Sequence, residues 1–274
     1  MSPAELAVHF VDAFVTDRGG GNRAAVVLMD EPASGAWRQA VAADLGAPAT
    51  TFAERQPDGR WRLRWFSPSV EMKSCGHGTL AAAAVLCDAL GLRPPLNFDT
   101  ELGPVTVDRV ADGFRLGFPA QATEPWELPD WAVAALGVEP AEVRRSERHC
   151  LVRVASVADV LAASPDLTAL SRLPTIGLAV TAAGSGRYDI TTRWFVAREG
   201  IEDQATGTAH TLVGPYWAER LGRPGLTALQ ASARGGHLEV VVEADRVLLG
   251  GRAITVLTGR LNNLARFEGS EGAQ

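Results

Sequence analysis

The chain has 274 residues, enough for one or two hydrophobic cores. Its 46% hydrophobic and 21% charged residues are ordinary for a soluble globular protein, and its net charge of −6 disfavours nucleic acid or a membrane surface as a partner. The first residues lack a basic segment followed by a long apolar run, so no signal peptide or spanning helix is indicated. The 3 cysteines are widely spaced, which suits a reducing compartment. We therefore expect a cytoplasmic protein.

The N-terminal segment predicts two strands joined by a glycine-rich turn. Residues 8–15 and 24–29 are apolar and β-branched, and the glycines at 19–21 separate them. Residues 19–24 also fit the dinucleotide fingerprint G-x-G-x-x-A, with Asp44 about 20 residues further on. That fingerprint requires a helix after the glycines, whereas "AAVVLMDEP" is short, β-branched and ended by proline. The sequence favours a hairpin turn and no bound cofactor.

Two helices and a strand follow in the first half. Residues 35–45 predict a helix with Ser34 as its N-cap. Residues 60–66, "RWRLRWF", alternate arginine with tryptophan and leucine, which is the period of a half-buried strand. An alanine- and leucine-rich helix is expected at 79–90, closed by Gly91.

The second half repeats this scheme. A strand is expected at 187–196, and it contains the same Arg-Trp-Phe triplet as the strand at 60–66. A small-residue turn at 206–210 then opens a second helix, which Pro215 should kink or delay. Such a duplication indicates two similar α+β domains. We place the first at 1–122 and the second at 123–274; the last residues could pack back on the first domain, and 269–274 look disordered.

The two helix-opening turns are the candidate binding site. The start of a helix presents backbone N–H groups and a positive dipole end, which hold a carboxylate. Two such turns would grip a small anionic substrate, and their glycines would let the backbone approach it. The substrate-binding candidates in these turns are Gly76, Gly78, Thr79, Thr206, Gly207 and Thr208.

Three further residues could carry proton chemistry. Cys75 lies at the first helix start, where the dipole and Lys73 would favour its thiolate, and His77 could move a proton near neutral pH. Asp203 brings a carboxylate to the second turn. Cys87 and the remaining Cys150 are expected to be inert, and no CxxC or HxxxH spacing indicates a metal site.

Three segments resemble the PhzF-like (phenazine biosynthesis-like) isomerases, within the diaminopimelate epimerase and proline racemase superfamily. "VDAFVTDRGGGNRAAVV" is similar to the family's opening, with Asn22 in its Gly-Asn signature and Arg23 in place of the usual proline. "RLRWFSPSVEMKSCGHGTLAAAAVL" is similar to its arginine strand and Gly-His segment, with Cys75 as in the racemases. "RWFVAREGIEDQATGTAH" is similar to its Glu-Asp-Pro-Ala-Thr-Gly-Ser-Ala-His block, with Gln204 for proline and Thr208 for serine.

The resemblance implies an α+β fold of two pseudo-symmetric domains. Each would be a mostly antiparallel sheet wrapped around a central helix, as in diaminopimelate epimerase, with the site between them. It adds Asn22 to the binding residues. It also implies proton transfer at carbon without a cofactor and, commonly, a homodimer.

Departures from the family pattern limit what carries over. PhzF-like isomerases move the proton with a glutamate before a Thr-Phe segment, and Ala49 stands in that place. The racemases use one cysteine per domain, and 205–208 contain none. Neither mechanism is complete, and the remaining catalytic candidates are Cys75, His77 and Asp203.

One relay can return a proton to another carbon of a conjugated system, whereas racemisation needs acids on opposite faces. We therefore expect a double-bond or tautomer shift in a small unsaturated amino-acid-like carboxylate. Cys75 or Asp203 would be the base, with His77 polarising or protonating the substrate. Analogy suggests antibiotic-type specialised metabolism, including alkylproline precursors. The alternatives are a catalytically lapsed binding protein and a one-thiol amino-acid epimerase.

Overall fold

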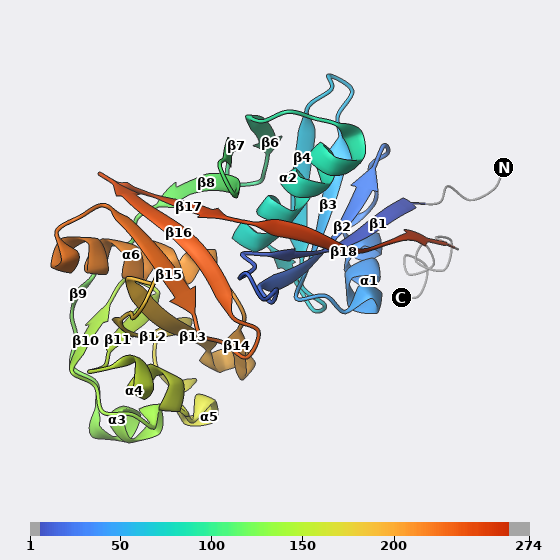
Figure 1. Cartoon of the computed structure of the whole chain (residues 1–274). Coiled ribbons are helices and arrows are strands. Elements are labelled where there is room, and N and C mark those ends of the chain that lie inside the picture. The colour runs from blue at the N-terminus through green and yellow to red at the C-terminus, as the bar shows by residue number, and fades with distance from the viewer. Residues whose placement is uncertain (1–5, 263–274) are drawn as a thin grey trace, which may run out of the picture. The chain divides into compact units, whose positions relative to one another are not determined.

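The computed structural model describes residues 6–262, which divide into two compact units (Figure 1). Unit 1 contains residues 6–13, 23–116 and 252–262, and unit 2 contains 14–22 and 117–251. The chain is thus not cut once near residue 122: two short segments each join the unit that is distant in sequence. The predicted disordered tail, 269–274, lies outside the described residues.

Hydrogen bonds explain why these segments cross over. The last strand, β18 (Ala253–Leu261), pairs antiparallel with β1 (Leu6–Ala13) along its whole length. The glycine turn belongs to unit 2 because the N–H of Gly21 donates to the carbonyl of Gly235 over 2.7 Å. The N–H of His237 likewise donates to the carbonyl of Phe14 over 2.9 Å.

Most strands of unit 1 run antiparallel to a neighbour, and β8, the strand at which the chain passes into unit 2, ends in residues assigned to that unit. Between β1 and β18 its elements are β2 (Asn22–Met29), α1 (Gly35–Leu45), β3 (Ala49–Arg55), β4 (Trp61–Phe66), β5 (Glu71–Met72), α2 (Gly76–Leu90), β6 (Leu96–Asp99), β7 (Val105–Val110) and β8 (Gly113–Pro119).

Unit 2 has the same kind of elements with two more short helices. In chain order they are β9 (Glu124–Pro125), α3 (Asp130–Leu136), β10 (Glu142–Arg145), β11 (His149–Arg153), α4 (Val157–Ala162), α5 (Leu167–Leu170), β12 (Gly177–Ala183), β13 (Ile190–Val196), the 3-10 helix η1 (Ala197–Glu199), β14 (Ile201–Asp203), α6 (Gly207–Leu221), β15 (Gly225–Gln230), β16 (Gly236–Glu243) and β17 (Arg246–Gly251).

The strand pairings of the two units follow one scheme. In unit 1, β2 pairs parallel with β3, β3 antiparallel with β4, and β4 both antiparallel with β5 and parallel with β6. In unit 2, β11, β12, β13, β14 and β15 repeat these pairings with the same orientations. Each unit places a long helix, α2 or α6, between the fourth and fifth strand of this scheme. The units are therefore structural repeats.

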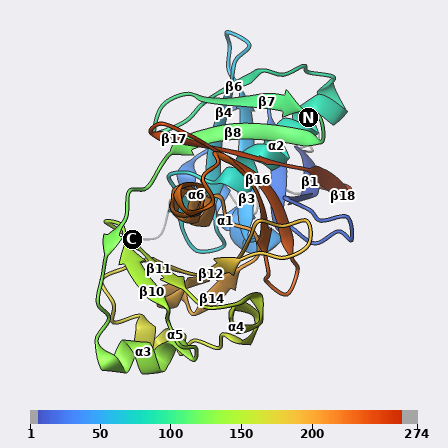
Figure 2. The same cartoon turned by 60° about the vertical axis from the view of Figure 1, so that its left-hand side comes forward.

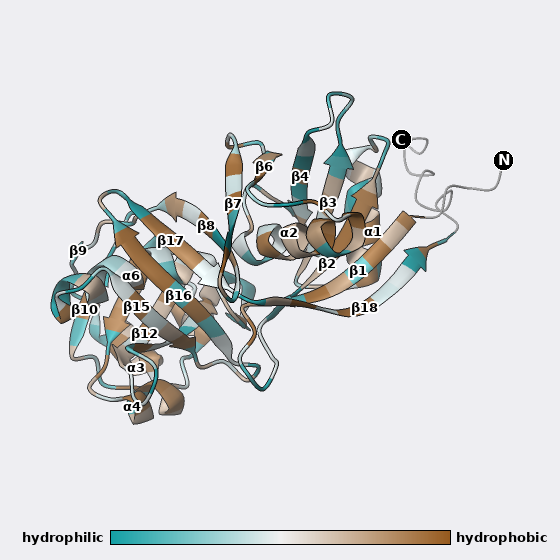
Figure 3. Cartoon of the chain, turned by 45° about the horizontal axis from the view of Figure 1, so that its top comes forward, coloured by the Kyte–Doolittle hydropathy of each residue, from teal (hydrophilic) through white to brown (hydrophobic). Residues whose placement is uncertain are grey.

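The helix of each unit is its buried centre. α2 contacts β1, β3 and β18, and its residues 78–86 are all buried. Figure 3 shows α2 mostly in the brown and white of apolar residues, with no polar face along its middle. α6 contacts β11, β12, β15, β16 and β17, and Figure 2 looks almost along its axis. A helix that is apolar all round is stable only when it is enclosed, so each sheet must wrap around its helix.

Local capping rules gave several element ends correctly. The predicted helix at 35–45 is α1, and the Ser34 hydroxyl accepts the N–H of Trp37 over 3.1 Å. α2 closes at Gly91 in the left-handed conformation, as expected, but it begins at Gly76 rather than near residue 79. The glycines that suggested a turn are therefore the first helical residues.

The expected break at Pro215 does not delay α6, which begins at Gly207 and continues through the proline to Leu221. A proline removes one N–H and so strips the carbonyl of the residue four positions earlier, Thr211, of its helical partner. Here the backbone N–H of Gln121 donates to that carbonyl over 3.0 Å. A segment distant in sequence thus satisfies the helix at this point.

The glycine-rich turn at 19–21 is followed by a strand, as the hairpin prediction requires. All three glycines have positive φ, and a Cβ at Gly20 would lie 1.9 Å from the backbone oxygen of Arg234. The turn is shaped to fit against its own unit rather than around a dinucleotide. No helix of the described chain is both long and apolar enough to cross a bilayer.

Candidate functional site

In unit 1, the chain leaves β5 and enters α2 at Cys75, the N-cap of that helix. Cys75 is extended, with φ −153° and ψ 104°, and is 8% exposed. Its carbonyl accepts two hydrogen bonds from Thr79, 3.0 Å from the backbone N and 2.7 Å from Oγ1. The thiol is therefore held at the positive end of a 15-residue helix, where an anion is stabilised.

The Cys75 sulfur contacts the imidazole of His77. Sγ lies 3.5 Å from Nδ1 and 3.7 Å from Nε2, and the ring is half-buried. A sulfur and an imidazole in contact can exchange a proton. The structure thus brings together the two unit 1 residues predicted for proton transfer.

Gly78 gives this sulfur its room. A Cβ at Gly78 would lie 3.0 Å from Cys75 Sγ, 2.9 Å from Trp65 Cδ1 and 2.6 Å from Thr51 Oγ1. Side chains from α2, β3 and β4 therefore converge on the space that the missing Cβ leaves open. Sequence reasoning predicted Gly78 but missed Thr51 and Trp65, since each lies in a strand distant in sequence.

The other cysteines differ from Cys75, and none of the three forms a disulfide. Burial raises the pKa of the Cys150 thiol to about 12, and burial also raises the pKa of Cys87. Both shifts keep a thiol protonated and unreactive. Lys73, expected to assist Cys75, is exposed and lies 3.8 Å from a carboxylate oxygen of Glu101.

In unit 2, Asp203 is bonded within the turn that opens α6. Its Oδ1 accepts from Asn22 Nδ2 over 2.7 Å and from the N–H of Gln204 over 2.9 Å. Its Oδ2 accepts from the hydroxyl of Thr206, the N-cap of α6, over 2.5 Å. Three donors on one carboxylate fix its orientation and tie three parts of the turn together.

Gln230, at the end of β15, completes this turn. Its side chain is fully buried; Oε1 accepts the N–H of Thr206 over 2.7 Å, and Nε2 donates to the carbonyl of Asp203 over 2.7 Å. Close packing adds to these bonds, because a Cβ at Gly236 would lie 2.6 Å from the Cβ of Ala205. Neither Gln230 nor Gly236 was expected from the sequence. Gln230 is a polar residue at the end of a strand and Gly236 is a glycine at the start of one, and neither feature alone indicates a site.

Asn22 reaches the same turn from the glycine hairpin. It is fully buried, and its Nδ2 donates to the carbonyl of Ala205 over 3.0 Å as well as to Asp203. Its Oδ1 is buried with no hydrogen-bond partner among the described residues. Within unit 2, Asn22 thus supports the turn that opens α6.

The first turn of α6 contains a buried neutral histidine. His210 Nδ1 lies 2.8 Å from the carbonyl of Thr206, so Nδ1 carries the proton and Nε2 the lone pair. Burial lowers the pKa of His210 to about 4, with the Thr206 carbonyl opposing the shift. His210 occupies the place that Thr79 occupies in α2, four residues after the N-cap. Gly207 is buried and Thr208 is exposed beside them.

Each helix-opening turn is held to its sheet by an arginine–glutamate pair. Arg64 on β4 binds Glu71 on β5 through two bonds of 2.6 and 2.7 Å. Arg193 on β13 binds Glu202 on β14 in the same way, over 2.7 and 2.9 Å. This explains the repeated Arg-Trp-Phe triplet: its arginine anchors the short strand that leads into the helix. Glu202 is thereby committed to a structural pair.

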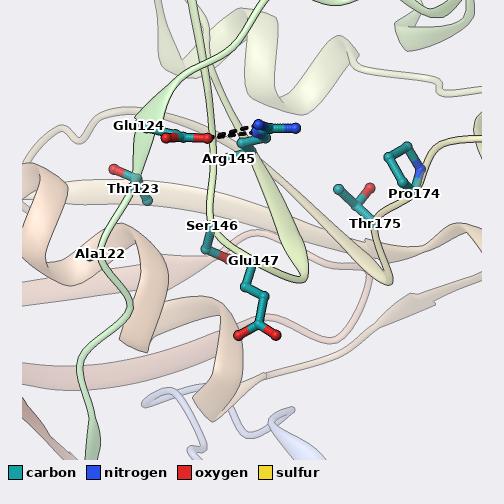
Figure 4. A pocket seen from close by; sticks show the side chains of 8 residues that line it. All are labelled: Ala122, Thr123, Glu124, Arg145, Ser146, Glu147, Pro174 and Thr175. Carbon is teal, nitrogen blue, oxygen red and sulfur yellow. Dashed lines mark hydrogen bonds and ion pairs between the residues drawn. The ribbon is translucent and has the colours of Figure 1, made fainter.

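A separate cavity of about 540 Å³ lies in unit 2 (Figure 4), and none of the predicted site residues lines it. It is lined by the hydroxyls of Thr123 and Thr175 and by the ion pair between Glu124 and Arg145. Within residues 6–262, no group of three or more His, Cys, Asp or Glu side chains is placed to hold a metal ion.

Comparison with known proteins identifies close relatives. The model of the phenazine biosynthesis-like (PhzC/PhzF) family matches residues 11–259. An uncharacterized isomerase of Pseudomonas aeruginosa is 42% identical over 94% of this chain and 99% of its own length. The crystal structure of a PhzF family protein from Enterococcus faecalis is 32% identical, with a TM-score of 0.90 over 95% of this chain and all of that one.

A more distant structure shares the fold alone. A probable proline racemase from Agrobacterium radiobacter is 15% identical, with a TM-score of 0.58 over 93% of this chain and 92% of its own. The predicted α+β fold with two pseudo-symmetric parts is therefore confirmed.

Proposed function

The chain belongs to the phenazine biosynthesis-like family and is an isomerase, and we propose that it moves a proton between two carbons of a small unsaturated amino-acid-like carboxylate. The product would be a double-bond isomer or tautomer of the substrate, and no cofactor would be needed. The contact between Cys75 Sγ and the His77 imidazole, at the amino end of α2, carries this proposal.

The proton would travel through these two side chains. The Cys75 thiolate takes a proton from a carbon next to a conjugated system, which leaves an electron pair delocalised over that system. The resulting thiol, or His77 after receiving its proton, returns the proton to a different carbon. The double bond has then moved, atoms and charge balance, and the thiolate is restored.

The second turn would bind rather than react. Three donors already hold the Asp203 carboxylate, which favours a positioning role over that of the base. The backbone N–H groups at the start of α6, at Gly207 and Thr208, and those at Gly76 and Gly78 would hold the substrate carboxylate and the enolate-like charge, whereas the N–H of Thr79 already donates to the carbonyl of Cys75.

The resemblance extends the proposal to the protein's setting. We infer a homodimer in the cytoplasm that acts in specialised metabolism of the antibiotic type, in which alkylproline precursors are one unsaturated substrate class. A lapsed binding protein is the alternative, because Ala49 is fully buried and offers no carboxylate. A one-thiol epimerase is a second alternative, because Cys75 alone could invert a centre if His77 supplied the other proton.

Deuterium exchange separates these three functions. The protein is incubated in heavy water with a panel of unsaturated and saturated amino-acid-like carboxylates, and incorporation is followed by mass spectrometry and NMR. We expect deuterium in an unsaturated substrate together with a shifted double bond. Cys75→Ala should reduce the rate by at least about a thousandfold, whereas Cys87→Ala, a thiol on the same helix, should leave it unchanged.

Each other outcome points to a different function. Binding of panel members without exchange into any of them indicates the lapsed protein. Exchange at a stereocentre with inversion indicates the epimerase. Full exchange by Cys75→Ala would remove the thiol from the mechanism and return Asp203 as the base, which Asp203→Asn then tests.

A further inference from the structure

Two buried polar groups beside Cys75 have no hydrogen-bond partner among the described residues. They are Oγ1 of Thr51, a residue with no exposed surface, and Nε1 of Trp65, a residue that is 2% exposed. Leaving a buried donor unpaired costs free energy, so such groups are rare in folded proteins. Two of them beside one sulfur indicate that an acceptor is expected there.

The position of Gly78 places the Thr51 hydroxyl near the sulfur. Thr51 Oγ1 and Cys75 Sγ lie 2.6 and 3.0 Å from a single point, the place of the missing Gly78 Cβ. The edge of the Trp65 ring, at Cδ1 next to Nε1, lies 2.9 Å from the same point. These distances describe a small enclosed space with a sulfur on one side and two hydrogen-bond donors on the others.

The strand carrying Thr51 offers this space no charged group. Side chains alternate between the faces of a strand, so Ala49 and Ala53 share the face of Thr51 while Thr50 and Phe52 share the opposite one. Phe52 packs in the cluster around Trp37 of α1, on the side away from α2. On this face of β3, Thr51 is the polar residue between Ala49 and Ala53, and Arg55 lies at the far end of the strand.

We propose that Thr51 is a positioning residue that stabilises the thiolate of Cys75. When the thiol loses its proton, the Thr51 hydroxyl donates a hydrogen bond to Sγ, and Trp65 Nε1 is a second donor at the same space. The inference rests on the proposed function, in which Cys75 acts as a base. Thr51 on β3 would then stabilise the thiolate of Cys75 in addition to the dipole of α2.

The charged and titratable groups of α2 and of the elements packed against it are His77, Cys87 and Asp88 on α2, His9 and Asp12 on β1, Glu54 and Arg55 on β3, and Arg260 on β18. On α2 itself, His77 contacts the sulfur. β1, which also packs on α2, carries Asp12, bound by Arg23 over 2.8 Å. β1 also carries His9, 3.2 Å from the hydroxyl of Thr258 on β18.

The test measures the alkylation rate of Cys75 against pH, so it needs no substrate. The probe is iodoacetamide, with mass spectrometry to resolve the three cysteines. Thr51→Val keeps the shape but removes the donor, and we expect the pH midpoint of Cys75 labelling to rise by about one unit, with labelling near neutral pH slowed about tenfold. Thr51→Ser restores a hydroxyl and should return the midpoint most of the way.

Thr50→Val is the matched control. Thr50 Oγ1 is equally buried and also has no partner among the described residues, yet it lies on the other face of β3. Its loss should leave the Cys75 midpoint within about 0.2 unit, since its distance from the sulfur prevents a hydrogen bond. If these substitutions changed Cys75 labelling only by destabilising β3, Thr50→Val and Thr51→Val would shift the midpoint by similar amounts.

Two results would overturn the proposal: an unchanged midpoint in Thr51→Val, or equal shifts in the Thr51 and Thr50 variants. Failure here is distinguishable from failure of the proposed function. If Thr51→Val shifts the midpoint but no carboxylate exchanges deuterium, Thr51 stabilises a thiolate in a protein that lacks the proposed activity.

Discussion

The first turns of α2 and α6 occupy the same place in the two units, and their polar groups differ. At α6, each polar group of the N-cap residue Thr206 is hydrogen-bonded: its N–H and Oγ1 to Gln230 and Asp203, and its carbonyl to His210. At α2, the N-cap is Cys75, and the buried hydroxyl of Thr51 beside it has no partner among the described residues. The N-cap residue of α6 is thus fixed by its own bonds. The buried groups left without a partner among the described residues are acceptors around the α6 turn, at Asn22 Oδ1, Gln204 Oε1 and His210 Nε2, and donors beside the α2 turn.

Under the proposed function, this structural duplication would separate binding at the α6 turn from proton transfer at the α2 turn. Both turns keep the arginine–glutamate pair that anchors them, so the backbone N–H groups at both helix starts are placed in the same way. Only the turn of α2 has a thiol at its N-cap. A rigid turn suits a carboxylate that must be held still, and available donors suit a group that changes charge during the reaction.

The largest expected effect comes from breaking the fixed turn. Gln230→Leu would leave the Thr206 N–H and the Asp203 carbonyl buried without partners, so we expect the free energy of unfolding to fall by about 4 kcal/mol. Asp99→Asn is the control in unit 1: Asp99 ends β6 as Gln230 ends β15, and its partner Arg60 is largely exposed. That change should cost less than about 1 kcal/mol. Urea unfolding measures both, and equal losses would mean that the turn of α6 is not specially fixed.

The reverse comparison exchanges the third residues of the two helices, Gly78 and Ala209. Gly78→Ala places a methyl within 3.0 Å of Thr51, Trp65 and Cys75, so we expect a loss of about 3 kcal/mol in unfolding free energy and altered Cys75 alkylation. Ala209→Gly should cost about 1 kcal/mol by helix propensity and leave the thiol unaffected. Unchanged Cys75 labelling in Gly78→Ala would show that the space beside the sulfur is not confined.

Local sequence patterns predicted the helices and strands, but not the residues distant in sequence that bond to the two helices α2 and α6 and to their opening turns. The period of residues 60–66 and the Ser34 cap are short-range signals: helix α1 has the predicted bounds, and strand β4 begins one residue later than predicted, at Trp61. The helix start at Gly76 was predicted too late because glycine is a poor helix former in isolation. The break at Pro215 was wrong because Gln121, whose N–H satisfies Thr211, lies far away in sequence.

The site shows the same limit. The sequence identified Cys75 and His77 because a thiol and an imidazole two residues apart are visible in one segment. Thr51 and Gln230 were missed because a threonine in a strand and a glutamine at a strand end have many structural uses. Only the fold shows that the Thr51 hydroxyl lies beside a sulfur without a partner among the described residues. Only the fold shows that Gln230 is bonded to both Asp203 and Thr206 in the turn that opens α6.

A third prediction uses the histidine that only the α6 turn contains. The folded pKa of His210, about 4, is below the ordinary 6.5, so the unfolded chain takes up the proton first as pH falls. Stability is therefore fully present above pH 6.5 and is lost towards pH 4, by about 2 kcal/mol between pH 7.5 and 5.0. Burial lowers the pKa of His149 to about 4 as well, so a second loss of the same sign adds to it.

Urea unfolding of His210→Gln at the two pH values checks this. The glutamine amide can still donate to the Thr206 carbonyl but does not titrate, so the loss on acidification should shrink by about 2 kcal/mol. Thr79, in the equivalent place of α2, does not titrate either, and Thr79→Val should leave the pH dependence as it is in the unmodified protein. A His210→Gln protein with undiminished acid sensitivity would contradict a buried neutral histidine in this turn.

The smallest effect is expected at Lys73, which the sequence suggested as a second source of positive charge for the thiolate. The structure places its ammonium 3.8 Å from Glu101, with the lysine side chain 75% exposed. An exposed charge is screened by solvent and salt, and one already paired has little field left at a distance. We expect Lys73→Met to change the Cys75 alkylation rate by less than about twofold at 0.1 M salt, against about tenfold for Thr51→Val. If the lysine variant instead slows labelling as much as the threonine variant, the thiolate depends on surface charge, and the donors beside Gly78 are not what distinguishes the turn of α2.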